Sequence, residues 1–456
     1  MSTENKDRMA MPSGQHKMGP NTAVLAAYNP DDHGGAVAVP NVNAATYAFL
    51  EADQGEHAFG CGYSLSETVA RLEADGKYSQ AADIYARLSG PTIRVVEDQL
   101  KALEPKSDWA CVFPSGMAAL NTLVHTTLHH ALGDSEDEPV RDVILHSPVL
   151  YGGTHALMHN VLLRWNFISV EADLSDPTKM KALIKQYGNR IGMVLCETPA
   201  NPTLDMTDIQ AVADILAEHY PNGHKPVFVV DNTFMGIFQN PLLHGADVAY
   251  YSCTKYMGGH SDLLAGALIG KDGRLARVKL FDGSLVDAPL FAGIMMLRTI
   301  GGWTTSSDVA QRLSVHLHTY RLRMKRQAAV ATEVAQFLST HEKVAHVGFP
   351  TMLSGKAKAI YAKQCDGPSG MIAFRLHEDT KEAAFKFLNA LELIIRAVSL
   401  GSTRTLANHP STWTHSDVNP ADQARLGISG GLIRFSVGIE DHEDLINDLR
   451  QALEAV

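Results

Sequence analysis

Cysteine is scarce in this chain of 456 residues, and the sequence contains no cysteine pair of the kind that binds metal. The cysteines Cys61, Cys111, Cys196, Cys253 and Cys365 lie far apart, form no CxxC motif and are odd in number. This pattern fits reduced thiols, so neither a disulfide framework nor a metal site is expected. Positive charge is not in excess either, because 39 Lys and Arg stand against 50 Asp and Glu, a formal net charge of −11. A nucleic-acid partner is therefore not expected.

Long apolar runs are also absent. No run reaches the length of a membrane span, and the polar stretch 1–20 lacks the apolar segment of a secretory signal. We therefore expect a cytoplasmic protein without membrane contact. The hydrophobic content of 45% is typical of a globular protein. The length favours two domains plus an arm over one small core.

Short apolar, β-branched runs alternate with amphipathic stretches from about residue 90. We predict buried strands at 112–113, 143–145, 193–195, 227–230, 248–250 and 267–269, with helices at 116–131, 152–162, 177–187 and 207–219. Asp205 or Thr207 is the expected cap of the last of these helices. This order predicts an α/β fold with a mostly parallel sheet covered on both faces.

The last third of the chain changes character. One long helix is expected at about 307–340, followed by an α+β region with strands near 370–375 and 432–438 and helices near 380–391 and 441–455. We divide the chain into an N-terminal arm (1–89), a large domain (90–306) and a small C-terminal domain (307–456).

Two segments indicate the chemistry. Asp231 ends the predicted strand 227–230, and Lys255 follows Ser252 and Thr254 just after the strand 248–250. Pyridoxal phosphate needs such groups: a lysine for a Schiff base, a carboxylate for the pyridinium nitrogen, and hydroxyls for the phosphate. Taken singly, a solvated loop lysine and an aspartate that caps a turn are the simpler interpretations.

Two further turns could complete such a site. Ser115, Gly116 and Met117 open a predicted helix whose free N–H groups suit an anion, although Ser115 could equally be a plain N-cap. Tyr151 also precedes a helix, and it could stack on a cofactor ring or exchange protons. An ordinary half-buried tyrosine is the alternative.

These motifs, with others in the same order, resemble the Cys/Met-metabolism family of fold-type I pyridoxal-phosphate enzymes, which holds γ-lyases and γ-synthases of sulfur amino acids. The resemblance covers roughly residues 80 to 456. The matching blocks are Tyr85-Ala86-Arg87, Ser115-Gly116-Met117, Tyr151-Gly152-Gly153-Thr154, Glu197-Thr198-Pro199-Ala200-Asn201-Pro202, Asp231-Asn232-Thr233, Ser252-Cys253-Thr254-Lys255, Ser399-Leu400-Gly401 and Ile433-Arg434-Phe435.

The resemblance implies a fold-type I transferase fold with a seven-stranded type of sheet. It also implies a role for each matching residue. Lys255 would carry the cofactor and move protons, Asp231 would pair with the pyridinium, and Tyr151 would stack on the ring and act as an acid. The phosphate would be bound by Ser115, Gly116, Met117, Ser252 and Thr254.

Further residues would complete the site. Tyr85 and Arg87 would reach the phosphate from a neighbouring subunit of a homotetramer, a dimer of dimers with shared active sites. Arg434 would hold the substrate carboxylate, with Ser399 and Asn201 beside it. A surface ion pair is the alternative for Arg434, but its strand setting disfavours this.

Several positions depart from the family pattern. Gly153 stands where methionine γ-lyases have cysteine, Arg404 where many members have glutamate, and Gly90 where asparagine is usual. Extra residues near 62–82 and 280–300 could reshape the entrance. Reversed charge at Arg404 should disfavour a substrate with a distal ammonium.

The favoured function is γ-elimination from methionine or a similar thioether, which gives 2-oxobutanoate, ammonia and a thiol. The alternative is γ-replacement, in which a cystathionine γ-synthase or O-acetylhomoserine sulfhydrylase makes a thioether from O-acyl-homoserine. An aminotransferase and a cofactor-binding regulator with negligible turnover are the remaining alternatives.

Overall fold

The computed structural model describes residues 18–63, 83–130, 140–221, 225–279, 285–416 and 418–456. These residues form two compact units. The first unit contains the described residues up to Asp142, together with Asp247–Cys253 and Leu263–His318. The second contains Val143–Ala246, Thr254–Asp262 and Thr319–Val456. The division of the chain after residues 89 and 306 stays a prediction.

The large sheet has seven strands. Of the strand pairs that lie within one unit, three are parallel and two are antiparallel. The second unit holds the order β5-β4-β2-β3, in which every pair is parallel. The first unit holds the order β1-β7-β6, in which β7 is antiparallel to both neighbours. The bounds are β1 Trp109–Phe113, β2 Val143–His146, β3 Ile168–Glu171, β4 Ile191–Glu197, β5 Val227–Asp231, β6 Val248–Tyr251 and β7 Gly266–Gly270. The prediction of a mostly parallel α/β sheet is confirmed.

Strand β3 is the one strand of this sheet that the apolar pattern did not predict. Its first three residues are partly exposed and Glu171 is exposed, whereas every residue of β2 and β4 is buried. A run that is not continuously apolar carries little signal for a strand of a parallel sheet.

The first unit adds mainly helices. Its other elements are α2 Pro20–Ala26, η1 Pro30–His33, α3 Ala52–Tyr63, α5 Pro91–Leu103, α6 Gly116–Thr127, α10 Leu290–Gly301, α11 Ser307–Leu317 and the hairpin of β8 Leu275–Lys279 with β9 Leu285–Pro289. Of the two segments expected to reshape the entrance, residues 64–82 and 280–284 lie outside the described residues.

The second unit holds the helices that accompany β2 to β5. They are α7 Gly152–Ala156, a π-helix η2 Leu157–Val161, η3 Leu162–Trp165, α8 Pro177–Tyr187, η4 Gly188–Arg190, α9 Ile209–His219, η5 Gly236–Phe238 and η6 Pro241–His244. Helix α8 has the predicted bounds, while the predicted helix 152–162 changes to π geometry after Ala156.

The predicted caps of α9 are wrong. Asp208 is the N-cap, and its side chain accepts a hydrogen bond from the Ala211 N–H at 3.0 Å. Thr207 instead donates its backbone N–H to Thr198 Oγ1 at 2.9 Å, so it belongs to the preceding loop. Asp205 accepts a hydrogen bond from the Thr203 hydroxyl within that loop.

The predicted single helix over 307–340 is also wrong, because α11 ends at Leu317 and α12 begins at Tyr320. The backbone of Thr319 leaves helical geometry, with φ −107° and ψ 2°. Its hydroxyl accepts a hydrogen bond from Arg323 Nε at 3.2 Å. A threonine that bonds the following turn favours a helix start over a helix interior.

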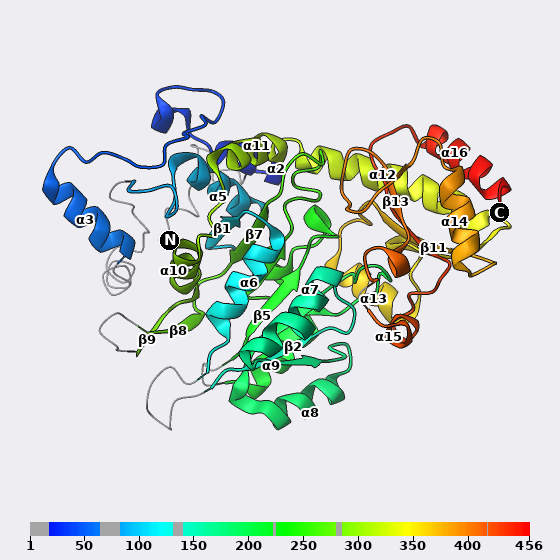
Figure 1. The fold of residues 1–456 in the computed structure, drawn as a ribbon, viewed down its shortest axis with the longest axis horizontal. Helices are drawn as coiled ribbons and strands as arrows, with labels where there is room; N and C mark the ends of the chain where they lie inside the picture. Colours follow the sequence, from blue (N-terminus) through cyan, green and yellow to red (C-terminus); the bar gives the residue numbers. More distant parts are fainter. Residues whose placement is uncertain (1–17, 64–82, 131–139, 222–224, 280–284, 417) are drawn as a thin grey trace. The chain divides into compact units, whose positions relative to one another are not determined.

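The C-terminal part of the second unit confirms the smaller α+β region. Its five-stranded sheet has the order β10-β11-β14-β13-β12, and Figure 1 shows α12, α14 and α16 beside β11 and β13. The apolar core includes Phe374, Phe387 and Phe435. The bounds are α12 Tyr320–Thr340, β10 Val344–Gly348, η7 Pro350–Met352, α13 Gly355–Gln364, β11 Met371–Leu376, α14 Lys381–Ala390, β12 Ile395–Arg396, β13 Leu406–Asn408, η8 Pro410–Thr412, α15 Pro420–Arg425, β14 Leu432–Ser436 and α16 His442–Glu454.

Candidate active site

Lys255 lies in a turn of the second unit and contacts a residue far away in the sequence. Its Nζ donates a hydrogen bond to Ser399 Oγ at 2.8 Å. Burial, together with the nearby positive charge of Arg434, lowers the pKa of Lys255 from 10.5 to about 8. A larger fraction of this amine is therefore uncharged near neutral pH than is usual for lysine. An uncharged amine is the form that attacks a carbonyl.

The segment from Ser399 to Gly401 packs directly against the lysine turn. Both of these residues have positive φ, 87° at Ser399 and 75° at Gly401. A Cβ at Gly401 would lie 2.4 Å from the Tyr256 nitrogen, so only glycine allows this approach. The Gly401 N–H also donates to Ser436 Oγ at 2.7 Å. The lysine turn and the Ser399–Gly401 segment are thus held together.

Arg323 of α12 fixes the other side of the lysine turn. Its guanidinium donates to the carbonyl oxygens of Tyr256 at 2.7 Å and Met257 at 2.9 Å. The side chain is buried, which lowers the pKa of Arg323 to about 10. Sequence analysis missed this residue, because one arginine in an amphipathic helix gives no sign of the backbone that it contacts.

Arg434 is a buried guanidinium in the middle of β14. Nη1 donates to Asn201 Oδ1 at 3.0 Å, and Nη2 donates to the Ser399 carbonyl at 2.7 Å. Nε is buried and has no acceptor among the described residues. No carboxylate in the described part of the chain lies within ion-pair distance of this arginine. Burial lowers the pKa of Arg434 to about 10.

A buried cation without an anionic partner is costly, so proteins rarely keep one unless a ligand completes it. The donors of Arg434 fit a planar carboxylate, which a guanidinium can bind through two parallel hydrogen bonds. A surface ion pair, the alternative considered from the sequence, does not describe this residue.

Two carboxyl groups end neighbouring strands of the second unit. Asp231 at the end of β5 is the register partner of Glu197 at the end of β4. The Thr233 N–H donates to Asp231 Oδ1 at 2.9 Å. Burial raises the pKa of Asp231 to about 6. It also raises the pKa of Glu197 well above the ordinary value, and the charge of Asp231 adds to this rise.

Tyr151 precedes α7, and its side chain is 41% exposed. Its backbone N–H donates to Glu197 Oε2 at 2.8 Å. The ring lies over Gly153, where a Cβ would come within 2.6 Å of Tyr151 Cε1. A ring with this exposure is open to a ligand, and the half-buried tyrosine considered as the alternative describes the same exposure.

In the first unit, the start of α6 lies beside the residue that follows β6. Ser115 is the N-cap of α6, since its Oγ accepts a hydrogen bond from the Ala118 N–H at 3.1 Å. A Cβ at Gly116 would lie 3.2 Å from the Cβ of Ser252. Met117 occupies the first turn of α6. The structure therefore brings Gly116 and Ser252 together at a helix N-terminus, where an anion is favoured.

Tyr85 and Arg87 also belong to the first unit. The guanidinium of Arg87 lies 5.8 Å from the centre of the Tyr85 ring, and its Nη1 donates to the Thr299 carbonyl at 2.8 Å. Tyr85 is 44% exposed.

In the second unit, Thr254 directly precedes Lys255. The second unit thus brings together Lys255, Ser399, Arg434 and Asn201, with Asp231 and Tyr151 joined through Glu197.

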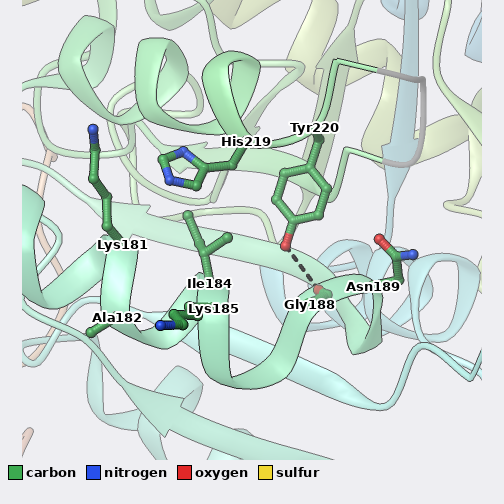
Figure 2. Close-up of a pocket in the computed structure, with 8 residues that line it drawn as sticks. All are labelled: Lys181, Ala182, Ile184, Lys185, Gly188, Asn189, His219 and Tyr220. Atoms are coloured by element: carbon green, nitrogen blue, oxygen red, sulfur yellow. Dashed lines mark hydrogen bonds between the residues drawn. The ribbon is translucent and has the colours of Figure 1, made fainter.

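A separate pocket of about 540 Å³ lies on the second unit, between α8 and the end of α9. Figure 2 shows the Tyr220 hydroxyl donating to the Gly188 carbonyl, at 2.8 Å. The residues that line it are Lys181, Ala182, Ile184, Lys185, Gly188, Asn189, His219 and Tyr220. None of the predicted site residues is among them.

Among the described residues, no helix combines the length and apolar character that a membrane span requires.

Residues 21–454 match the model of a family described as Cys/Met metabolism PLP-dependent enzymes. The chain belongs to this family. It is 33% identical over 434 residues to an L-methionine gamma-lyase of Pseudomonas putida, with 95% of this chain and 96% of the relative covered. It is 34% identical over 393 residues to the cystathionine gamma-lyase of Sus scrofa, which covers 86% of this chain and 88% of the relative.

A solved structure of the same kind shows the shared fold. The cystathionine gamma synthase of Xanthomonas oryzae pv. oryzae, in complex with aminoacrylate and cysteine, matches with a TM-score of 0.79 and 28% identity, covering 96% of this chain and 99% of that chain. The protein is therefore a pyridoxal-phosphate-dependent enzyme of cysteine and methionine metabolism that acts on a small amino acid. Three groups of the site fit this cofactor and substrate class. They are the Lys255 amine with its lowered pKa, the Asp231 carboxylate at the end of β5, and the Arg434 guanidinium, which has no anionic partner among the described residues.

Proposed function

We propose that the protein catalyses γ-elimination from methionine or a similar thioether amino acid, releasing 2-oxobutanoate, ammonia and a thiol. The observation that carries the proposal is the buried Arg434 guanidinium, which lacks an anionic partner in the described chain and lies near Lys255. An amino-acid carboxylate would complete it. Several relatives of this chain bear the name L-methionine gamma-lyase, which supports the choice of substrate.

We assign the cofactor contacts as follows. Lys255 attaches pyridoxal phosphate, Asp231 pairs with the pyridinium nitrogen, and Tyr151 stacks on the ring. The phosphate is bound by Ser115, Gly116, Met117, Ser252 and Thr254, and by Tyr85 and Arg87 of a neighbouring copy of the chain. The sharing of sites requires an oligomer, for which we propose a cytoplasmic homotetramer. The contact of Gly116 with Ser252 and the exposure of Tyr85 support this assignment.

The residues then have distinct tasks in the reaction. Bound pyridoxal phosphate supplies an electron sink for negative charge that develops at the substrate's Cα and Cβ. Arg434 and Asn201 hold the substrate carboxylate, which orients the Cα–H bond. Once the substrate's amine has displaced it from the cofactor, the Lys255 amine would be free to remove the Cα proton, and its hydrogen bond with Ser399 would set its direction. Tyr151 donates a proton to the departing sulfur.

The second candidate is γ-replacement, in which a thiol adds in place of the group that leaves. Gly153 favours this candidate, because methionine γ-lyases carry a cysteine there. The likeness to a cystathionine gamma synthase structure agrees with it. The exposed cation of Arg404 would disfavour the distal ammonium of cystathionine in either reaction.

Product analysis of the purified holoenzyme separates the candidates. We expect 2-oxobutanoate, ammonia and methanethiol from methionine, faster than thioether formation from O-acetyl- or O-succinyl-homoserine with cysteine or sulfide. Lys255→Ala should lose both the activity and the visible absorption of the bound cofactor. Thioether formation that far exceeds 2-oxobutanoate release would establish the synthase, and formation of pyridoxamine phosphate in stoichiometric amount would establish an aminotransferase.

A further inference from the structure

Glu197 has no task in the proposed reaction, yet it lies among the residues that do. It ends β4 and is only 5% exposed. Its register partner in the adjacent parallel strand is Asp231, the proposed pyridinium partner. Register partners in neighbouring strands lie about 4.8 Å apart and point to the same face of the sheet. Two carboxyl groups are therefore near neighbours at this sheet edge.

The carboxyl group of Glu197 accepts a backbone hydrogen bond at each of its oxygens. Oε2 accepts from the Tyr151 N–H and Oε1 from the Asn201 N–H, both at 2.8 Å. Asn201 in turn accepts from Arg434 Nη1. One buried carboxyl thus connects two parts of the proposed site. The first is the start of α7, where the proposed ring-stacking tyrosine lies, and the second is the loop that contacts Arg434, the proposed partner of the substrate carboxylate.

The charged and titratable surroundings of this carboxyl come from several elements. Asp231 lies beside it at the end of β5, Arg434 approaches from β14, and Cys196 precedes it on β4. Tyr151, which directly precedes α7, contacts it through the backbone N–H. Arg434 is the cation of this group, and it makes no ion pair with Glu197 within the described residues. The repulsion between the two carboxylates is therefore only partly offset.

We propose that Glu197 is a positioning residue that fixes Tyr151 and Asn201, and that it shares protons with Asp231, so that this carboxyl pair sets the lower pH limit of pyridoxal phosphate binding. The inference depends on the proposed role of Asp231. Two carboxyl groups this close titrate as a pair in two coupled steps. A proton taken up by the pair reduces the negative charge available to a pyridinium.

The test measures pyridoxal phosphate binding to the cofactor-free protein by equilibrium dialysis between pH 5 and 8. Glu197→Gln removes one of the two coupled carboxyls, so the pH at which binding falls to half should drop by about one unit or more. Glu197→Asp keeps the charge but shortens the reach. It should leave this pH unchanged while amide hydrogen exchange at Tyr151 and Asn201 becomes faster in the cofactor-free protein.

Glu171→Gln is the matched control. Glu171 ends β3, the edge strand that is separated from β4 by β2. Its carboxylate pairs with Arg425 at 2.6 and 2.9 Å and not with the Asp231 side of the sheet. Neither binding nor exchange at Tyr151 and Asn201 should change.

An unmoved lower limit in a folded Glu197→Gln variant overturns the inference and leaves the proposed function standing. Equal shifts in Glu197→Gln and Glu171→Gln also overturn it, because they indicate a general effect of net charge. A native chain that binds no pyridoxal phosphate at any pH overturns the proposed function together with the inference.

Discussion

Replacing Arg434 by methionine should lower kcat/KM roughly 100-fold and barely change the stability of the cofactor-free protein. Removal of a buried arginine from an ion pair usually costs about 3–5 kcal/mol, because its partner is left charged and buried. Arg434 has no such partner among the described residues. Its positive charge is held for a ligand, so the folded chain should lose little without it.

The expected stability change follows from two opposing contributions. Burial lowers the pKa of Arg434 from 12.5 to about 10, a cost to the charged form of about 3 kcal/mol. The hydrogen bonds to Asn201 Oδ1 and the Ser399 carbonyl stabilise the fold by about 1.5 kcal/mol each, because the donor is charged. The two contributions nearly cancel, so the free energy of unfolding should change by no more than about 1 kcal/mol.

Catalysis should respond very differently. Loss of a buried, charged hydrogen-bonding partner from a complex costs about 2–5 kcal/mol. A loss of about 3 kcal/mol lowers kcat/KM roughly 100-fold. Arg434→Lys keeps the charge but not the two parallel hydrogen bonds, so it should fall between the native protein and Arg434→Met.

Urea unfolding of the cofactor-free variants and steady-state kinetics of the holoenzymes provide the two measurements. Arg298→Met is the matched control, because Arg298 is fully buried and forms an ion pair with Glu97. It should lose about 3–5 kcal/mol of stability. A loss of that size in Arg434→Met as well would refute the argument, since it would identify Arg434 as a structural residue. Unchanged kcat/KM would refute its role in binding the substrate carboxylate.

Three other predictions concern the lysine turn and the phosphate. The pKa of Lys255 of about 8 predicts how the rate of cofactor attachment to the cofactor-free protein depends on pH. The rate should rise about tenfold per pH unit up to about pH 8 and then level off, because the uncharged amine becomes the major form. A stopped-flow rate that still rises steeply above pH 9 would contradict this prediction. Gly401→Ala should lower the free energy of unfolding in urea by about 2–3 kcal/mol and reduce cofactor binding. The reason is that the added Cβ would lie 2.4 Å from the Tyr256 nitrogen, at a residue whose φ is 75°. Native values for both quantities would show that the turn can accommodate a Cβ at this position. Arg87→Ala should weaken pyridoxal phosphate binding, measured by dialysis, about tenfold or more. The loss of its hydrogen bond to the Thr299 carbonyl should lower the free energy of unfolding by only about 1 kcal/mol. Full affinity in a folded variant would argue against a phosphate contact across subunits.

The sequence alone located the residues whose signal is local. Asp231 and Lys255 could be found because each follows an apolar strand, and ligands of α/β sheets bind beyond the carboxyl ends of the strands. The turn at Ser115 and Gly116 was predicted as a helix start for a similar reason. Strands β1, β2, β4, β5, β6 and β7 were predicted because each contains a short apolar run, whereas β3 lacks such a run and is partly exposed.

Helix ends were less predictable, because they depend on one side chain's choice of partner. Thr207 looked like a cap, yet its N–H bonds Thr198 in the preceding loop and leaves the cap to Asp208. The apolar spacing continues through Thr319, where the helix stops, since the pattern of buried residues is the same for one helix or for two in succession.

Only the tertiary structure decided the charge states and the connections between distant residues. Lys255 meets Ser399 across 144 positions, and Arg434 meets Asn201 across 233. The pKa values of Lys255, Asp231 and Arg434 depend on burial, which is produced by packing and is invisible in a list of residues. Motif spacing therefore determined the kind of chemistry, whereas Glu197 and Arg323 could be recognised only once folding had placed a carboxyl beside Asp231 and a guanidinium against the lysine turn.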